Sequence, residues 1–150
     1  MWTKRKNIFK EWINRNKTMK GIFIKKASII AEDERRKIIS VLNGELNIRD
    51  IHILHMKEGG KILGNHYHWY PEVMFIMKGG GTWYLKNRTH DSNEENGSNE
   101  MEIKLEEGDI MIKAPFITHT AIVDADSIIL DGSAESWVGE DFNHYKEVLK

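Results

Sequence analysis

The sequence contains no cysteine and only two prolines among its 150 residues. Without thiols, a disulfide framework and a thiolate zinc site are both excluded, so any bound metal must be held by histidine and carboxylate. No apolar run approaches the length of a membrane span, and the net charge is −1. We therefore expect neither a membrane nor nucleic acid as a partner. With 40% apolar and 30% charged residues, the composition is that of one soluble globular domain, which we expect in the cytoplasm.

Only the two ends of the chain show a helical pattern. Residues 1–18 are basic and place Phe9, Trp12 and Ile13 at helical spacing. They predict a short amphipathic helix, packed on the domain or on a partner subunit, or an appendage to it. This segment lacks the continuous apolar stretch of a signal peptide. The C-terminal EDFNHYKEVLK predicts a second short helix, and we expect the folded domain to span residues 19–150.

Between the ends, the sequence is a series of short apolar segments separated by Gly, Asn or Asp. They are GIFIKKASII, KIISVLNG, IRDIHILHM, EVMFIMKGG, GTWYLKN, MEIKLEEGD, IMIKAP, HTAIVD and SIILDG. Many short strands at regular spacing predict an all-β sandwich or barrel rather than βαβ units. One stretch within residues 86–104, NRTHDSNEENGSNE, is too polar to order itself. It predicts a flexible acidic loop between two hairpin strands, with His90 exposed.

Two histidines stand one residue apart in GNHYHWYPE. On a strand, residues i and i+2 share a face, so His66 and His68 should point the same way. Glu72 begins the next strand, and a third histidine, His119, follows a proline turn in EEGDIMIKAPFITHT. Three imidazoles and a carboxylate suit a divalent transition metal, namely zinc, iron, manganese, nickel or copper. A lone histidine is more often a hydrogen-bonded core residue or exposed, which is our interpretation of the remaining ones: His52, His55 and His144.

These residues resemble the two motifs of the cupin superfamily. The first motif is Gly, a spacer, His-x-His, three or four residues, Glu, six residues and Gly. The positions that match it are Gly64, His66, His68, Glu72 and Gly79. The second motif is matched by Gly108, Pro115 and His119, but its turn glycine is replaced here. The resemblance implies a single-domain β-barrel of the jelly-roll type and a homodimer. It also implies an interior metal site whose ligands are His66, His68, Glu72 and His119, with Met74 and Ile76 beside them.

The segment DERRKIISVLNGELNIRDIHILHMKEGGKILGNHYH is similar to the deoxysugar branch of the cupins. That branch contains nucleotide-sugar 3,4-ketoisomerases and is related to 3,5-epimerases. The C-terminal ESWVGEDFNHYKEVLK resembles its closing segment. Arg36 stands where the branch has glycine, and Leu63 stands where it has an arginine. The resemblance implies a small-molecule ligand, a sugar or nucleotide sugar, but one expected anchor for an anionic substrate is absent.

The leading functional hypothesis is an enzyme with isomerase or epimerase chemistry on a carbohydrate at a metal-binding cupin site. The first alternative is a metal-free nucleotide-sugar ketoisomerase that moves protons through an enediol. It would use His66 and His68, with Glu72 or Tyr84 as the partner acid. The metal-dependent and the metal-free hypotheses differ in whether the histidines bind a metal ion or transfer a proton. The second alternative, from another class, is a non-catalytic cupin that binds a small metabolite.

Overall fold

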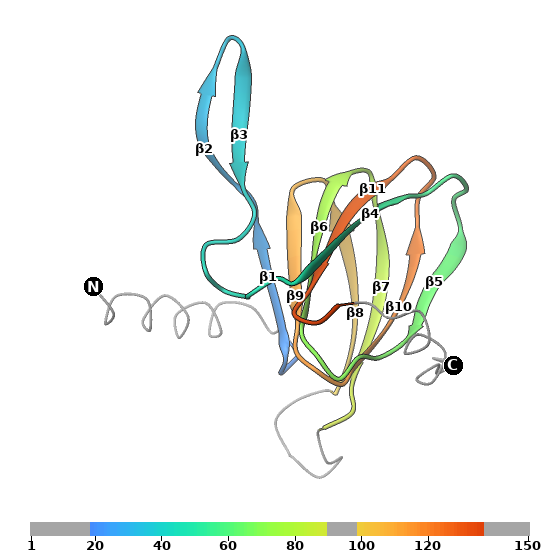
Figure 1. Cartoon of the computed structure of the whole chain (residues 1–150). Coiled ribbons are helices and arrows are strands. Elements are labelled where there is room, and N and C mark those ends of the chain that lie inside the picture. Colours follow the sequence, from blue (N-terminus) through green and yellow to red (C-terminus); the bar gives the residue numbers. More distant parts are fainter. Residues whose placement is uncertain (1–18, 90–98, 137–150) are drawn as a thin grey trace.

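The structure is a computed structural model that describes residues 19–89 and 99–136. All regular secondary structure in these residues is β-strand (Figure 1), which confirms the predicted all-β class. No helix in the described residues is long and apolar enough to cross a membrane. The two predicted terminal helices lie outside the described residues, as do His90 and His144.

Nine of the strands form two antiparallel sheets. The five-stranded sheet has the order β1-β9-β6-β11-β4, and the four-stranded sheet has the order β5-β10-β7-β8. The first comprises β1 (Ile22–Lys26), β9 (Asp109–Lys113), β6 (Glu72–Lys78), β11 (Ile128–Ser133) and β4 (Asp50–His55). The second comprises β5 (Lys61–His66), β10 (Ile117–Val123), β7 (Gly80–Asn87) and β8 (Glu100–Glu106). A separate hairpin is formed by β2 (Ser28–Asp33) and β3 (Arg36–Ser40).

The main core lies between the two sheets. Alternation places every second side chain of a strand inward, and the inward positions are apolar: Ile76 and Trp83, for example, are 0% and 1% exposed. Met74 and Ile76 point inward from β6, as predicted. A second cluster lies on the outer face of the five-stranded sheet. There residues 41–48 cover Val73, Phe75 and Ile110.

Two strand predictions differ from the structure. GIFIKKASII was expected as one strand, but it divides at Ala27, whose N–H donates to the carbonyl of Gly108 at 2.8 Å. The chain then leaves the sheet and pairs with β3 as a hairpin. β5 was not among the apolar segments expected as strands, although His66 and His68 were expected to lie together on a strand; the strand ends at His66. The strands that flank the acidic segment do pair, with Lys86 opposite Glu100.

Candidate functional site

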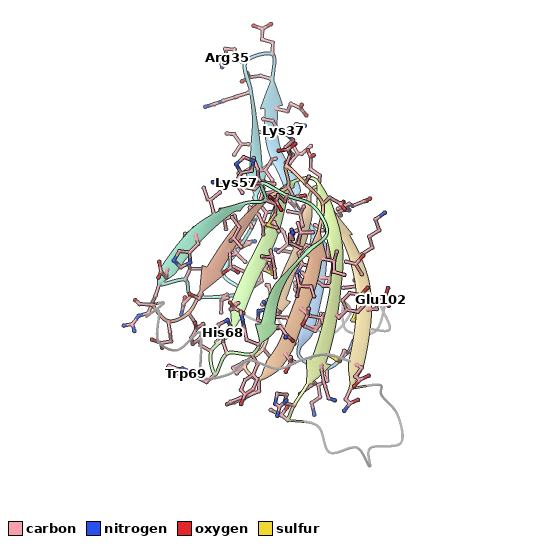
Figure 2. The ribbon with its side chains drawn as sticks, turned by 90° about the vertical axis from the view of Figure 1, so that its right-hand side faces the viewer. Arg35, Lys37, Lys57, His68, Trp69 and Glu102 are labelled. Atoms are coloured by element: carbon pink, nitrogen blue, oxygen red, sulfur yellow. The ribbon has the colours of Figure 1, made fainter. Side chains whose placement is uncertain are left out.

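A cavity of about 260 Å³ lies between the two sheets. Its wall is apolar on the side of Leu54, Leu63 and Trp83, while polar and charged side chains line the remainder. The five-stranded sheet contributes His52, Glu72, Met74, Lys113, Asp131 and Ser133, and the four-stranded sheet contributes His66, His119 and Ala121. Figure 2 shows His68 and Trp69 at the end of the sheets away from the hairpin tip, which is marked by Arg35 and Lys37.

A β-bulge in β5 aims His66 into this cavity. Leu63 and His66 both line it although they are three residues apart, so simple alternation would place them on opposite faces. The register against β10 shifts here, and Gly64 and Asn65 adopt positive φ angles of 74° and 63°. A Cβ atom on residue 64 would lie 2.7 Å from the carbonyl oxygen of His119. The glycine of the motif is therefore required twice, for its φ angle and for this close approach.

His68 lies beyond the end of β5, in the segment that leads to β6. Its carbonyl accepts a 2.7 Å hydrogen bond from the N–H of Phe116, in the turn between β9 and β10. The turn lacks the glycine of the cupin motif, and Phe116 takes the left-handed conformation instead, with φ 63°. The two motif segments are thus held together by the backbone. The ring of Tyr70 stacks on His68 with a centroid distance of 4.9 Å.

The three predicted histidines converge. One ring nitrogen from each of His66, His68 and His119 lies within 4.8 Å of the others. All three residues are buried. Nδ1 of His119 lies 3.1 Å from the carbonyl oxygen of Ile117. A carbonyl only accepts, so Nδ1 carries the proton and Nε2 presents a lone pair to the cluster.

Glu72 is at the centre of the polar group. Its Oε1 lies 3.3 Å from Nε2 of His68, and its Oε2 lies 3.8 Å from Nε2 of His119. Oε2 also forms a 2.9 Å ion pair with the ammonium of Lys113, which is directly opposite it in the β6–β9 register. Both partners are buried, with side chains 8% and 2% exposed. Nζ of Lys113 also lies 3.7 Å from the sulfur of Met74.

Burial and this ion pair determine the charge state of the cluster. Burial by itself would raise the pKa of Glu72, but the Lys113 ammonium, with smaller effects from the neighbouring imidazoles, lowers that pKa to about 2. Burial lowers the pKa of His66 to about 4. Burial and then the Lys113 charge hold the pKa of His119 well below 6.5. At neutral pH the site therefore contains a carboxylate, an ammonium and at least two neutral imidazoles.

A second carboxyl group shares the cavity. Asp131 lies on β11, opposite Met74 of β6 and opposite His52 of β4. Burial, reinforced by the negative charge of Glu72, raises the pKa of Asp131 to about 7, against the opposing effect of Lys113. This side chain can therefore hold or release a proton near neutral pH.

The structure does not bring Tyr84 to the cluster. Trp83 and Leu85 are the inward residues of β7, so the intervening Tyr84 lies on the outer face of its sheet. The predicted role of Tyr84 as partner acid has no support from this position.

Sequence reasoning missed Lys113, Asp131 and Tyr70. Two of them could have been found by alternation. Lys113 shares a face with Met111 in DIMIK, and Asp131 shares one with Ile129 in IILDGS, so each is a charged residue on an apolar strand face. Tyr70 lies in a non-repetitive segment, where no periodicity indicates direction.

The donor set fits a metal ion in part. Three histidine nitrogens at this spacing suit one ion, and the backbone carbonyl on Nδ1 of His119 is the usual outer partner of a metal-binding imidazole. The fourth expected ligand, Glu72, is already paired with a buried ammonium. That positive charge, held beside the histidines, opposes a second cation.

No protein-family model matches the chain, and no curated protein matches it. Solved structures do resemble it. A dTDP-4-dehydrorhamnose 3,5-epimerase from Bacillus anthracis, with TDP and PPi bound, is 12% identical over 86% of this chain and 79% of that chain, with a TM-score of 0.68. A mutant of the 3,4-ketoisomerase QdtA from Thermoanaerobacterium thermosaccharolyticum, in complex with TDP-4-keto-6-deoxyglucose, is 14% identical over 83% of this chain and 87% of that chain, with a TM-score of 0.65.

A third match is ChmJ, a 3'-monoepimerase from Streptomyces bikiniensis in complex with dTDP-quinovose. It is 9% identical over 83% of this chain and 69% of that chain, with a TM-score of 0.69. These matches extend over most of the chain, which folds into the two antiparallel sheets described above. The chain therefore has the cupin jelly-roll fold of the RmlC-like type that its histidine motifs predicted.

Proposed function

We propose that this protein is a carbohydrate isomerase or epimerase that moves a proton next to the carbonyl group of a keto sugar. One observation carries this proposal: the buried Lys113–Glu72 pair is surrounded by imidazoles in the cavity wall. Removing a proton from a carbon beside a carbonyl requires a base that is neutral near pH 7 and a fixed positive charge for the developing enolate oxygen. Neutral imidazoles and the ammonium of Lys113 lie in the wall of the same cavity.

We assign the role of base to His68. Glu72 lies 3.3 Å from Nε2 of His68, so its carboxylate stabilises the imidazolium that forms when the ring accepts a proton. The ammonium of Lys113 then faces the enolate oxygen. Isomerisation follows when the proton returns to the former carbonyl carbon and the proton of the adjacent hydroxyl group moves to the enolate oxygen, so that the carbonyl shifts by one carbon. Epimerisation follows when the original carbon is protonated from the opposite side and the carbonyl forms again at its first position. Asp131, with a pKa of about 7, is the group that can supply this second proton.

The size of the cavity limits the part of the substrate that it can enclose. A volume of about 260 Å³ suits a single sugar ring, so a nucleotide would extend outside. Leu63 lines the cavity where the deoxysugar cupins carry arginine. Leu63 has no charge that could bind a diphosphate at that point, so a nucleotide sugar must be held by contacts beyond the cavity. The proposed substrate class is a 4-keto sugar, as a nucleotide sugar in line with the ligands of the matched structures.

The test is solvent exchange. Wild-type protein incubated with TDP-4-keto-6-deoxyglucose in D2O should incorporate deuterium beside the carbonyl, read by mass spectrometry and NMR. Lys113→Met should lower the rate by about 100-fold or more, because one preorganised charge is typically worth that much. Tyr84→Phe, on the outer face, is the matched control and should retain the wild-type rate. Absence of exchange with keto-sugar nucleotides of this class would contradict the proposal.

A second candidate is a metal-dependent form of the same chemistry, which the convergence of the three histidine nitrogens favours. The residues that would hold the ion are His66, His68 and His119. A bound ion would supply Lewis acidity to a carbonyl oxygen. In that case Lys113 orients Glu72 rather than contacting the substrate. Because only this second candidate needs an ion, chelation should abolish its activity and leave that of the first candidate unchanged.

A further inference from the structure

His52 lines the cavity but lies outside the cluster of the other three histidines. It belongs to β4, the end strand of the five-stranded sheet. Half-buried and exposed positions alternate along this strand, and the half-buried ones are Asp50, His52 and Leu54. The inner face of this end strand therefore brings an imidazole and a carboxyl group to the border of the cavity.

The titratable groups of the cavity reach solvent at this border. The described residues contribute eight titratable side chains to the cavity wall, and all but two of them are buried; the exceptions are His52 and Asp131. The side chain of His52 is 41% exposed. The path by which side chains connect the buried cluster with solvent therefore runs through these two residues.

Asp131 is the neighbour of His52 toward the interior. The two residues are directly opposite each other in the β4–β11 register, and both line the cavity. Residues opposite each other on one face of an antiparallel pair have Cβ atoms about 4.5–5.5 Å apart, a separation at which an imidazole and a carboxyl group can exchange a proton. Burial raises the pKa of Asp131 to about 7, and imidazoles in general titrate near the same pH. A proton can therefore pass between two such groups in either direction at little cost in free energy.

Asp50 lies on the other side of the His52 ring. Its Oδ2 lies 3.5 Å from Nε2 of His52, and its Oδ1 accepts a 3.0 Å hydrogen bond from the N–H of Ile51. A carboxylate that is held in this way fixes the orientation of the imidazole beside it. Asp50 therefore orients the ring that lies opposite Asp131.

We propose that His52 is a proton relay that returns a proton from solvent to Asp131 after each turnover. The inference rests on the proposed function, in which epimerisation moves one proton from the substrate carbon to His68 and one proton from Asp131 to the opposite side of that carbon. Asp131 is then a carboxylate. His52, as an imidazolium, gives a proton to this carboxylate and takes another from solvent, while His68 releases the proton that it accepted. The substrate carbon thus exchanges its hydrogen for one from solvent, and the protein returns to its first state.

The test measures deuterium incorporation into TDP-4-keto-6-deoxyglucose by His52→Ala in dilute buffer, with and without added imidazole. The rate should fall by about 10-fold or more, because a positioned proton carrier is worth at least that much. Free imidazole should restore the rate in proportion to its concentration, whereas sodium chloride at the same ionic strength should not. His52→Gln, which fills the position without a titratable ring, should behave in the same way. A purely structural role of His52 predicts no such rescue.

The matched control is His55→Ala, on the same strand. The side chain of His55 is 59% exposed, lies 3.9 Å from Asp126 and occupies an outward position of β4. This variant should keep the wild-type rate with or without imidazole. His52→Ala/Asp131→Asn should not respond to imidazole, because the group that receives the proton is missing.

A wild-type rate in His52→Ala would overturn the relay and leave the proposed function standing. A slow His52→Ala that imidazole does not restore would have the same meaning, and so would rescue of the double variant. Absence of exchange by the wild-type protein would instead contradict the proposed function, and the relay with it.

Discussion

Replacing Lys113 by methionine removes the cation from the centre of the site and leaves Glu72 as a buried carboxylate without its partner. The pKa of Glu72 is about 2 in the folded chain against about 4.5 in an unfolded one, a difference that corresponds to roughly 3 kcal/mol of stability at pH 7. Breaking a buried ion pair from one side costs about 3–5 kcal/mol. The two estimates agree, so we expect Lys113→Met to lower the free energy of unfolding by about 3 kcal/mol.

The sign of the pH dependence follows from the lowered pKa. A carboxyl whose pKa is lowered in the folded chain stabilises the fold fully above pH 4.5, and this stabilisation is lost as the pH falls toward 2. The difference in the free energy of unfolding between Lys113→Met and wild type should therefore shrink in acid. Denaturant titrations at pH 7 and pH 4 measure this. Lys113→Met/Glu72→Gln removes both charges and should return to within about 1 kcal/mol of wild type. A single variant that loses less than about 1 kcal/mol, or a double variant no more stable than the single one, refutes the ion-pair reasoning.

Three further predictions concern the same cavity. Asp131→Asn should raise the free energy of unfolding at pH 8 by about 2–4 kcal/mol and have little effect at pH 4. The reason is that a carboxyl with a raised pKa costs stability as the pH rises from 3.8 through 7; an equal gain at both pH values contradicts this. Gly64→Ala should cost about 2–4 kcal/mol, against about 1 kcal/mol for Gly60→Ala, which has a similar φ angle but no neighbour within 4 Å; equal losses in denaturant titrations remove the role of the His119 contact. Lys113→Met should bind zinc at least about 10-fold more tightly than wild type in calorimetric titrations, because the ammonium no longer repels the ion; unchanged affinity places the lysine outside the histidine site.

The fold and the convergence of the histidines could be predicted from the sequence because both depend on local pattern. Alternation predicts the inner face of β6 from Glu72 to Ile76, and the two motifs bring His66, His68 and His119 together. The helices expected at the ends, and the mobility expected of the acidic loop, remain predictions, since they fall outside the described residues.

The remainder of the site depends on pairing between strands that are distant in the sequence. Lys113 meets Glu72 only because β9 and β6 lie side by side in a particular register, and no local pattern contains that information. The sequence did not predict the face of the sheet on which Tyr84 lies, for a related reason. Alternation places Tyr84 outward only once Trp83 and Leu85 are known to point inward. The β2–β3 hairpin was not predicted because a single apolar run, GIFIKKASII, contains both an edge strand of the five-stranded sheet and the first strand of this hairpin.

The account claims that protons are moved at this site by the cluster of His68, Glu72 and Lys113, with the ammonium as the fixed positive charge. The most direct measurement is the rate of deuterium incorporation into TDP-4-keto-6-deoxyglucose before and after exhaustive chelation of the wild-type protein. The account predicts the same rate in both samples and a rate at least about 100-fold lower in Lys113→Met. Exchange that disappears on chelation and returns with added zinc or manganese, while Lys113→Met remains active, would contradict it.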